Sequence, residues 1–229
     1  MNTHSRLTSF FVMVFLALMV SACKPKLVIG PEQTFTLDVP RPESSSAINV
    51  TLEMAVPQGM LNLSGGAEGL IQGAITYNAA EYEPQMTNGD GTLLIRQAEP
   101  GPKSVVVSVQ NNLINQWDLQ LGDAPMNFEI HLENGEYIVE FAESLTADFS
   151  ATLNAGIGNV NLVIDPNLAA RVIVGEKTDL LDVKTRGDWT QIGDTYEAVA
   201  GSAALTITVN MRGGTLTLDN KQKEQPDAN

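Results

Sequence analysis

The chain has 229 residues, of which 27 are acidic and 13 are basic, so its formal net charge at pH 7 is −14. A protein with this charge repels the phosphate backbone, which excludes nucleic acid as a partner. With one cysteine and two histidines, the chain cannot form an internal disulfide or a histidine-rich metal site.

Residues 1–22 have the features of a secretion signal. Arg6 lies in a short polar head, and Phe10–Val20 follows as an apolar run without a polar interruption. A membrane-spanning helix needs about 20 apolar residues, and this run is shorter. The pattern therefore favours a cleaved signal peptide over a permanent transmembrane anchor.

The segment Val20-Ser21-Ala22-Cys23 directly follows the apolar run and resembles the lipobox of bacterial lipoproteins. The resemblance implies cleavage before Cys23, acylation of its sulfur, and a membrane partner held through that lipid at an extracytoplasmic location in the cell envelope. Several acyl chains together give firm anchoring. The alternative is an ordinary signal followed by a chance cysteine, and the lack of any other cysteine argues against it. Residues 23–33 would then be the lipidated cysteine and a tether.

The body alternates apolar and polar residues with a period of two, which predicts β-strands. Examples are Thr34–Val39, Asn49–Met54, Leu93–Ile95, Ser104–Val109 and Trp117–Leu121. The turn-forming residues 99–102 predict a boundary between an N-terminal β subdomain, 34–98, and a set of repeats, 99–218. The polar residues 219–229 predict a disordered tail.

Residues 128–141 show the clearest strand–turn–strand pattern. Apolar side chains alternate on both sides of Asn134-Gly135, a pair that favours the two-residue turn of a β-hairpin. We therefore predict that the two halves of 128–141 pair as an antiparallel hairpin.

Similar turns follow the one near 135, near positions 157, 176 and 213, so that successive turns are 22, 19 and 37 residues apart. An imperfect repeat of about 20 residues is typical of solenoids, in which stacked units bury their apolar faces against each other. The sequence predicts an all-β fold of stacked short strands in a β-helix-like solenoid. An antiparallel β-sandwich explains the alternation equally well.

The segments 61–73 and 75–78 resemble the N-terminal part of the toast-rack family of bacterial envelope proteins. The stretch from 115 through 128–141 to 164 is similar to the repeats that follow in that family. The resemblance implies a two-faced solenoid of stacked strands over about residues 34–218. Related domains form C-terminal modules of membrane-bound cell-wall-stress regulators and of adhesin-like proteins. The family offers no catalytic residues or cofactor to carry over, and the lipid anchor departs from the membrane helices of the stress regulators.

His131 is the only histidine that remains after removal of the signal. Strand alternation places it on the face opposite the apolar side chains, beside Glu129 and Glu133. A lone histidine lacks the further ligands of a zinc site, and no nucleophile motif accompanies it. We interpret it as part of a solvated strand face and predict no catalytic or metal-binding residues.

Four weaker patterns have ordinary structural interpretations. Residues 88–91 and Gly156-Ile157-Gly158 echo a calcium loop and a dinucleotide fingerprint, but we expect turns at both. Residues 186–188, Arg-Gly-Asp, match a recognition tripeptide that arises often by chance. The fourth pattern is the set Trp189, Ile192 and Tyr196. These side chains either form an exposed patch that stacks on sugar rings or pack at the edge of the core, and the sequence leaves both interpretations open.

The favoured function is a non-catalytic binding or structural module at the cell surface, with an envelope protein or glycan as partner and the ligand-binding residues unknown. The alternative is an adhesin or a carbohydrate-binding module. A less favoured alternative is a polysaccharide-cleaving β-helix enzyme, whose candidate charged residues would be Asp165, Asp179, Asp182, Arg171 and Lys184.

Replacing Cys23 by serine is expected to abolish acyl-lipid labelling, because the hydroxyl does not substitute for the acylated thiol. The signal should also stay uncut by the lipoprotein peptidase. Metabolic labelling with a radioactive fatty acid and the mass of the mature chain measure both effects. Persistent labelling of Cys23→Ser would show that the lipobox interpretation is wrong.

Overall fold

A computed structural model describes residues 28–43, 46–97, 112–142, 144–145, 149–175, 178–198 and 205–220. Several predicted features lie outside the described residues: the signal, Cys23, the strand at 104–109, the boundary at 99–102 and most of the tail. Within the described ranges, no helix is long and apolar enough to cross a membrane.

The described chain consists mainly of β-strands, with one 3-10 helix, η1 (Ala80–Tyr82). The strands are β1 (Gln33–Val39), β2 (Ile48–Met54), β3 (Gln58–Gly65), β4 (Ile71–Tyr77), β5 (Pro84–Gly89), β6 (Thr92–Gln97), β7 (Asn115–Leu121), β8 (Met126–Leu132), β9 (Gly135–Phe141), β10 (Phe149–Ile164), β11 (Ala170–Val174), β12 (Leu181–Arg186), β13 (Trp189–Ile192), β14 (Thr195–Ala198) and β15 (Leu205–Asp219).

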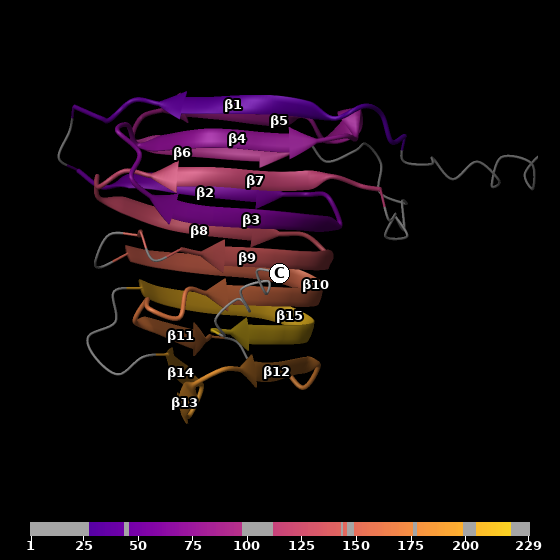
Figure 1. The fold of residues 1–229 in the computed structure, drawn as a ribbon, viewed down its shortest axis with the longest axis vertical. Helices are drawn as coiled ribbons and strands as arrows, with labels where there is room; N and C mark the ends of the chain where they lie inside the picture. Colours follow the sequence, from indigo (N-terminus) through magenta and orange to yellow (C-terminus); the bar gives the residue numbers. More distant parts are fainter. Residues whose placement is uncertain are drawn as a thin grey trace, which may run out of the picture.

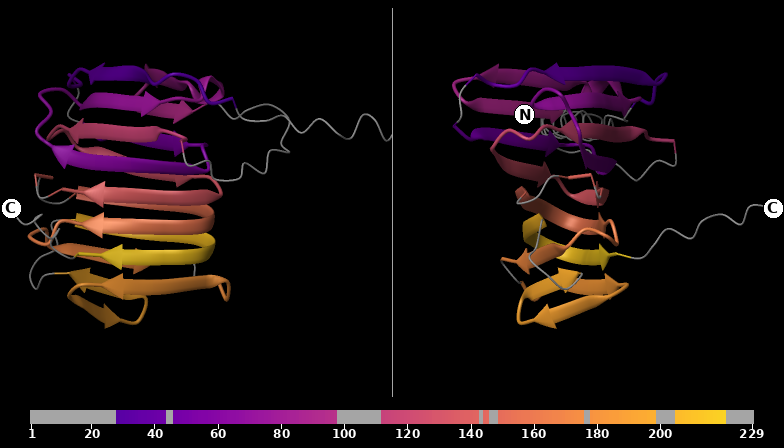
Figure 2. Two further views of the ribbon diagram at one scale, coloured as in Figure 1. Left: turned by 45° about the vertical axis from the view of Figure 1, so that its right-hand side comes forward. Right: turned by 60° about the vertical axis from the view of Figure 1, so that its left-hand side comes forward.

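The strands form one sheet that folds over into two layers, so that the molecule is a stack of short rungs (Figures 1 and 2). Face A contains, in spatial order, β1, β4, β7, β3, β9, the second halves of β10 and β15, and β12. Face B contains β5, β6, β2, β8, the first halves of β10 and β15, β11, β14 and β13. The strands β10 and β15 each cross from face B to face A, whereas the other rungs use two strands.

The rungs in the middle of the stack pair in parallel. Among the described strands, antiparallel pairs occur only toward the two ends, where β1, β4 and β5 lie at one end and β13 and β14 at the other. The prediction of an all-β fold of stacked strands is therefore confirmed. Parallel pairing through the centre rules out the antiparallel sandwich, the alternative that periodicity left open.

The order of the rungs in space differs from their order along the chain. The β2–β3 rung lies between β6–β7 and β8–β9. The last strand, β15, lies between β10 and the pair β11 and β12, and it bonds to both sides. The C-terminal strand is therefore an interior rung of the stack and holds the final repeat in place.

Each strand directs alternate side chains inward, as a pleated sheet requires. Leu61, Val139, Leu162 and Leu218 take the same position on four successive rungs of face A, and all are buried. Trp117 lies beside Leu61 on β7 and is fully buried. The inward side chains of both faces form one hydrophobic cluster through the stack, so the N-terminal and C-terminal segments share a core.

The chain passes from face B to face A at a corner lined by glycine. Gly135, Gly158 and Gly214 stand in register on three successive rungs. A Cβ atom on Gly158 would collide with the carbonyl oxygen of Gly135, and one on Gly214 would collide with that of Gly158. Gly214 also has a φ of +104°. Glycine at this corner therefore allows neighbouring backbones to approach closely enough to stay bonded through the bend.

The hairpin predicted over 128–141 is wrong. The strands β8 and β9 lie on opposite faces, and each pairs in parallel with a different half of β10. Asn134-Gly135 forms the corner between them, where the Asn134 side chain accepts a hydrogen bond from the Ile157 N–H at 2.7 Å. The turns predicted near 157 and 213 are bends at this corner within the continuous strands β10 and β15, and the turn predicted near 176 lies outside the described residues. A two-residue hairpin joins β5 and β6 at Asp90-Gly91, both with positive φ, and confirms the turn expected at 88–91.

A buried hydrogen bond holds the corner between β2 and β3. The Tyr137 hydroxyl, on the next rung, donates to the backbone carbonyl of Val56 with an O–O distance of 2.6 Å. Tyr137 is 3% exposed. Burial, and to a smaller extent the charge of Glu133, raises the pKa of the Tyr137 hydroxyl well above its usual range. The corner therefore depends on a neutral tyrosine.

Gly214→Ala should destabilise the fold far more than Gly66→Ala, which serves as a matched control. The two glycines have φ values of +104° and +102°, but a Cβ atom on Gly66 meets no other atom. Gly66→Ala should cost about 1–2 kcal/mol of unfolding free energy from backbone strain alone. Gly214→Ala should cost more than about 4 kcal/mol, because the collision adds to that strain. Urea unfolding of the chain from residue 23 with Cys23→Ser measures both, and equal losses would contradict the account of the corner.

Stability should fall as the pH rises above about 10, the pKa of tyrosine in an unfolded chain. Because the folded state raises the pKa of Tyr137, its stabilisation is complete below pH 10 and is lost as the pH climbs toward the folded value. Tyr137→Phe should cost about 1–2 kcal/mol at pH 7 by leaving the Val56 carbonyl unpaired. It should also flatten the alkaline loss, as followed by thermal unfolding from pH 8 to 11. An unchanged slope would contradict the role given to this hydroxyl.

Candidate functional site

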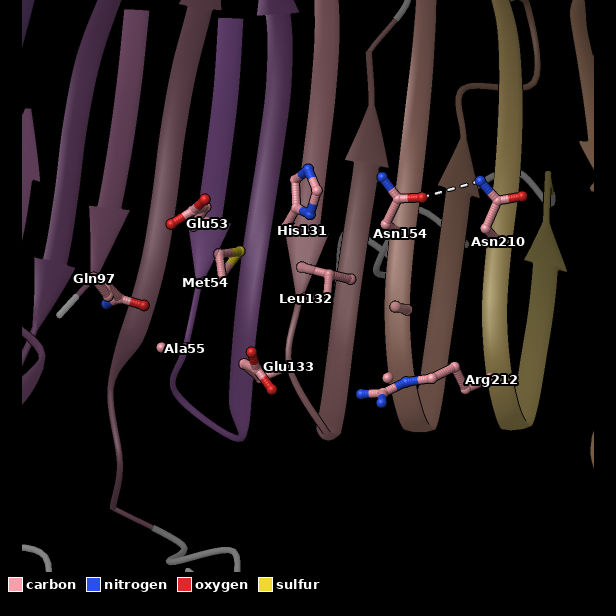
Figure 3. Close-up of a pocket in the computed structure, with 12 residues that line it drawn as sticks. Glu53, Met54, Ala55, Gln97, His131, Leu132, Glu133, Asn154, Asn210 and Arg212 are labelled. Carbon is pink, nitrogen blue, oxygen red and sulfur yellow. Dashed lines mark hydrogen bonds between the residues drawn. The ribbon is translucent and has the colours of Figure 1, made fainter. Parts of the chain in front are cut away.

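Four polar side chains form a row on the outer surface of face B. Glu53, His131, Asn154 and Asn210 lie in register on the successive strands β2, β8, β10 and β15. All four are half-buried. They alternate with the inward residues of their strands, so the packing of the core fixes which way they point. Figure 3 shows the row, with the Asn210 amide donating to the Asn154 side-chain oxygen at 3.0 Å.

The next outward row lies at the corner and creates a hollow. Each of its residues lies two positions after a residue of the first row, and the row consists of Ala55, Glu133, Gly156 and Arg212. Ala55 has a small side chain, and at Gly156 the Asn134 side chain packs against the backbone. The resulting depression has a volume of about 420 Å³ and is lined by both rows (Figure 3).

Within the lining of the depression the charged side chains are separated rather than paired, and Arg96 lies in register with Glu53 on the adjacent strand β6. Glu53 and Glu133 lie on one side and Arg212 on the other (Figure 3). Among the described residues Arg212 makes no ion pair, and its backbone carbonyl accepts a hydrogen bond from Thr178. The surface thus offers a carboxylate-rich region and a free guanidinium on the same rigid sheet.

His131 has the position that the sequence predicted. Its side chain points outward, and its Nε2 atom lies 3.1 Å from a carboxylate oxygen of Glu129, two residues earlier on the same face. Glu133 lies beyond the end of β8, in the corner row. The described residues contain no group of three or more histidine, cysteine or acidic side chains arranged to hold a metal ion.

A buried polar network closes the floor of the depression toward the core. Gln97 is 3% exposed, and its side-chain amide donates to Asn115 at 2.8 Å. The Trp117 indole N–H donates to the same Asn115 oxygen at 3.0 Å. The Gln97 oxygen is buried and has no hydrogen-bond partner among the residues that the structure describes. An unsatisfied buried acceptor in the wall of a depression is a position where a donor group would be stabilised.

A second depression of about 510 Å³ lies on face A. Met60 and Ile138 form an apolar strip, and Gln58, Glu136 and Asn161 lie around it. Within the described part of the chain, the side-chain oxygens of Gln58 and Asn161 are buried without hydrogen-bond partners. This site has amides and one carboxylate but no basic side chain.

The other sequence patterns take ordinary structural roles. Tyr196 is in the core, Trp189 is half-buried and packs against it, and Ile192 is exposed, so the core-edge interpretation holds for the two aromatic residues. In the Arg-Gly-Asp segment the Arg186 carbonyl accepts from the Trp189 indole at 3.1 Å, and the Asp188 carbonyl accepts from Asn220 at 2.9 Å.

The charged residues proposed for a polysaccharide-cleaving site do not come together. Arg171 lies on face B and bonds to Glu197 at 2.9 Å. Asp182 and Lys184 pair with each other on face A at 3.3 Å. Asp165 follows the end of β10, where its side chain accepts from the Asn167 N–H. The described structure therefore gives this constellation no common groove.

Together, the parallel rungs, the glycine corner and the polar outer rows define a two-faced, stacked-strand β protein. The family described as the N-terminal domain of toast_rack, DUF2154, matches residues 28–171, and the chain belongs to this family. The strands β12 to β15 continue the same stack beyond the matched residues.

Two solved structures resemble the chain. A "putative cell adhesion protein" from Clostridium sporogenes is 18% identical, with a TM-score of 0.53 over 83% of this chain and 99% of its own. A "putative adhesin" from Bacteroides fragilis is 11% identical, with a TM-score of 0.24 over 83% and 97% of the two chains. No curated protein matches the chain. At this identity the first similarity supports the fold alone.

Proposed function

We propose that the protein is a lipid-anchored, non-catalytic binding module of the bacterial cell envelope. The face-B depression carries this proposal, because it presents unpaired charges of both signs on a rigid scaffold. The Asn154 and Asn210 side chains beside these charges are held by their mutual hydrogen bond, so they lose little freedom when a ligand arrives. The candidate enzyme residues remain apart, which supports binding rather than cleavage.

The short tether supports an anchored module. The Gly30 N–H donates to the Asn78 carbonyl at 2.7 Å and fixes the start of the described chain to the end of β4. From Cys23 to Val28 an extended chain spans at most about 18 Å. A lipid on Cys23 would therefore hold this end of the stack close to a membrane surface, with the rest of the stack free to meet other envelope components.

Adhesion or carbohydrate binding is the second candidate, and the face-A depression favours it. Amide and carboxylate side chains around an apolar strip suit the hydroxyl groups and the C–H face of a neutral sugar. The adhesion description of the Clostridium sporogenes protein points the same way. A glycan array should then retain the chain, with Asn161→Ala reducing retention several-fold. No retention on any glycan would remove this candidate.

The main proposal predicts retention of the purified full chain on isolated cell envelopes without release of sugar or peptide products. Neutralising the depression with Glu53→Gln, Glu133→Gln and Arg212→Gln together should lower retention at least about tenfold, the effect of losing a few polar contacts. The matched control removes two acids and one base from face A and the loop before it, by Asp179→Asn, Asp182→Asn and Lys184→Gln. Product release, or equal retention of both triple variants, would contradict the proposal.

A further inference from the structure

We propose that the face-B depression binds a short peptide with free ends, whose ammonium group lies at Glu53 and Glu133 and whose carboxylate lies at Arg212. The inference rests on the proposed binding function and names the class of ligand. Nothing in the family match or in the similar structures assigns a ligand to this surface.

The distribution of charge selects a zwitterion. A ligand with several negative charges would meet Glu53 and Glu133, and a polycation would meet Arg212. The Arg212 guanidinium has no ion-pair partner among the described residues, and a guanidinium binds a carboxylate strongly because it donates two parallel hydrogen bonds. In a chain with a formal net charge of −14, a surface that attracts an anionic group is unusual.

The spacing of the charges sets the length of the ligand. Glu133 and Arg212 occupy the same outward row two rungs apart, with Gly156 on the rung between them. Adjacent strands lie about 4.8 Å apart, so the two backbones are separated by about 10 Å. An extended peptide spans about 3.3–3.6 Å per residue, so three or four residues bridge the two charges. Gly156 lines the depression between them, and the Asn134 side chain packs against it.

The middle of the depression offers polar groups to a peptide backbone. The Asn210 amide donates to the Asn154 oxygen, which leaves the Asn154 amide as a donor, whereas the Asn210 oxygen faces Gly175, directly after β11. The buried Gln97 oxygen is an acceptor without a hydrogen-bond partner among the described residues. The described lining contains no Phe, Tyr or Trp ring on which a sugar would stack. The observations therefore favour a peptide over a glycan at this site.

The test uses the lipidated full chain in detergent micelles and isothermal titration with tri-alanine. Tri-alanine should bind saturably, and either N-acetylation or C-amidation should weaken it at least tenfold. Arg212→Gln should remove the preference for the free carboxylate and keep that for the free amine. Glu133→Gln should do the reverse. Lys184→Gln, which removes a basic side chain on face A, is the control and should bind like the unchanged protein.

Several outcomes would overturn the inference. They are no saturable binding of tri-alanine or of tetra-alanine at millimolar concentration, equal affinity for the free and blocked peptides, or the same loss in Lys184→Gln as in Arg212→Gln. Binding of a neutral oligosaccharide with no peptide binding would assign the surface to glycans instead. If peptides fail while retention on envelopes still depends on the Glu53, Glu133 and Arg212 triple variant, only the peptide inference falls. If retention fails too, the proposed function falls with it.

Discussion

The close approach of backbones at the glycine corner is the constraint on which the rest of the structure depends. A side chain at Gly158 or Gly214 would collide with the carbonyl of the preceding rung. Without that approach, β10 and β15 could not bend from one face to the other and stay paired with their neighbours. The same corner carries Glu133, Gly156 and Arg212, which line the face-B depression. The corner that folds the sheet therefore also positions the candidate site.

The sequence predicted the strands well, because inward and outward residues alternate with a clear period of two. It failed at 128–141, where Asn134-Gly135 suits both a hairpin and a corner. The distinction depends on the neighbouring rung, since Asn134 bonds to Ile157 and Gly135 packs beneath Gly158. The interior position of β15 could not be predicted either, because alternation shows which side chains are buried but not which strands pair.

The candidate site could be predicted only in part. Alternation placed His131 on the outer face beside Glu129, as observed. No sequence signal pointed to its neighbours, because Glu53, Asn154 and Asn210 come from distant segments and meet only through the parallel register. Arg212 was missed for the same reason. Had the strand register been known, the small residues at outward corner positions would have been a sequence signal for the site.

The central claim is that the last strand of the chain lies inside the stack, between β10 and β11. Amide-to-amide nuclear Overhauser effects in the deuterated protein test it most directly. The account predicts contacts from the residues around Ile207 to those around both Ala151 and Val172, which are its partners in register. It also predicts no direct contacts between the strands of Ala151 and Val172. Contacts between those two strands, with β15 bonded on one side only, would contradict the fold and the site built on it.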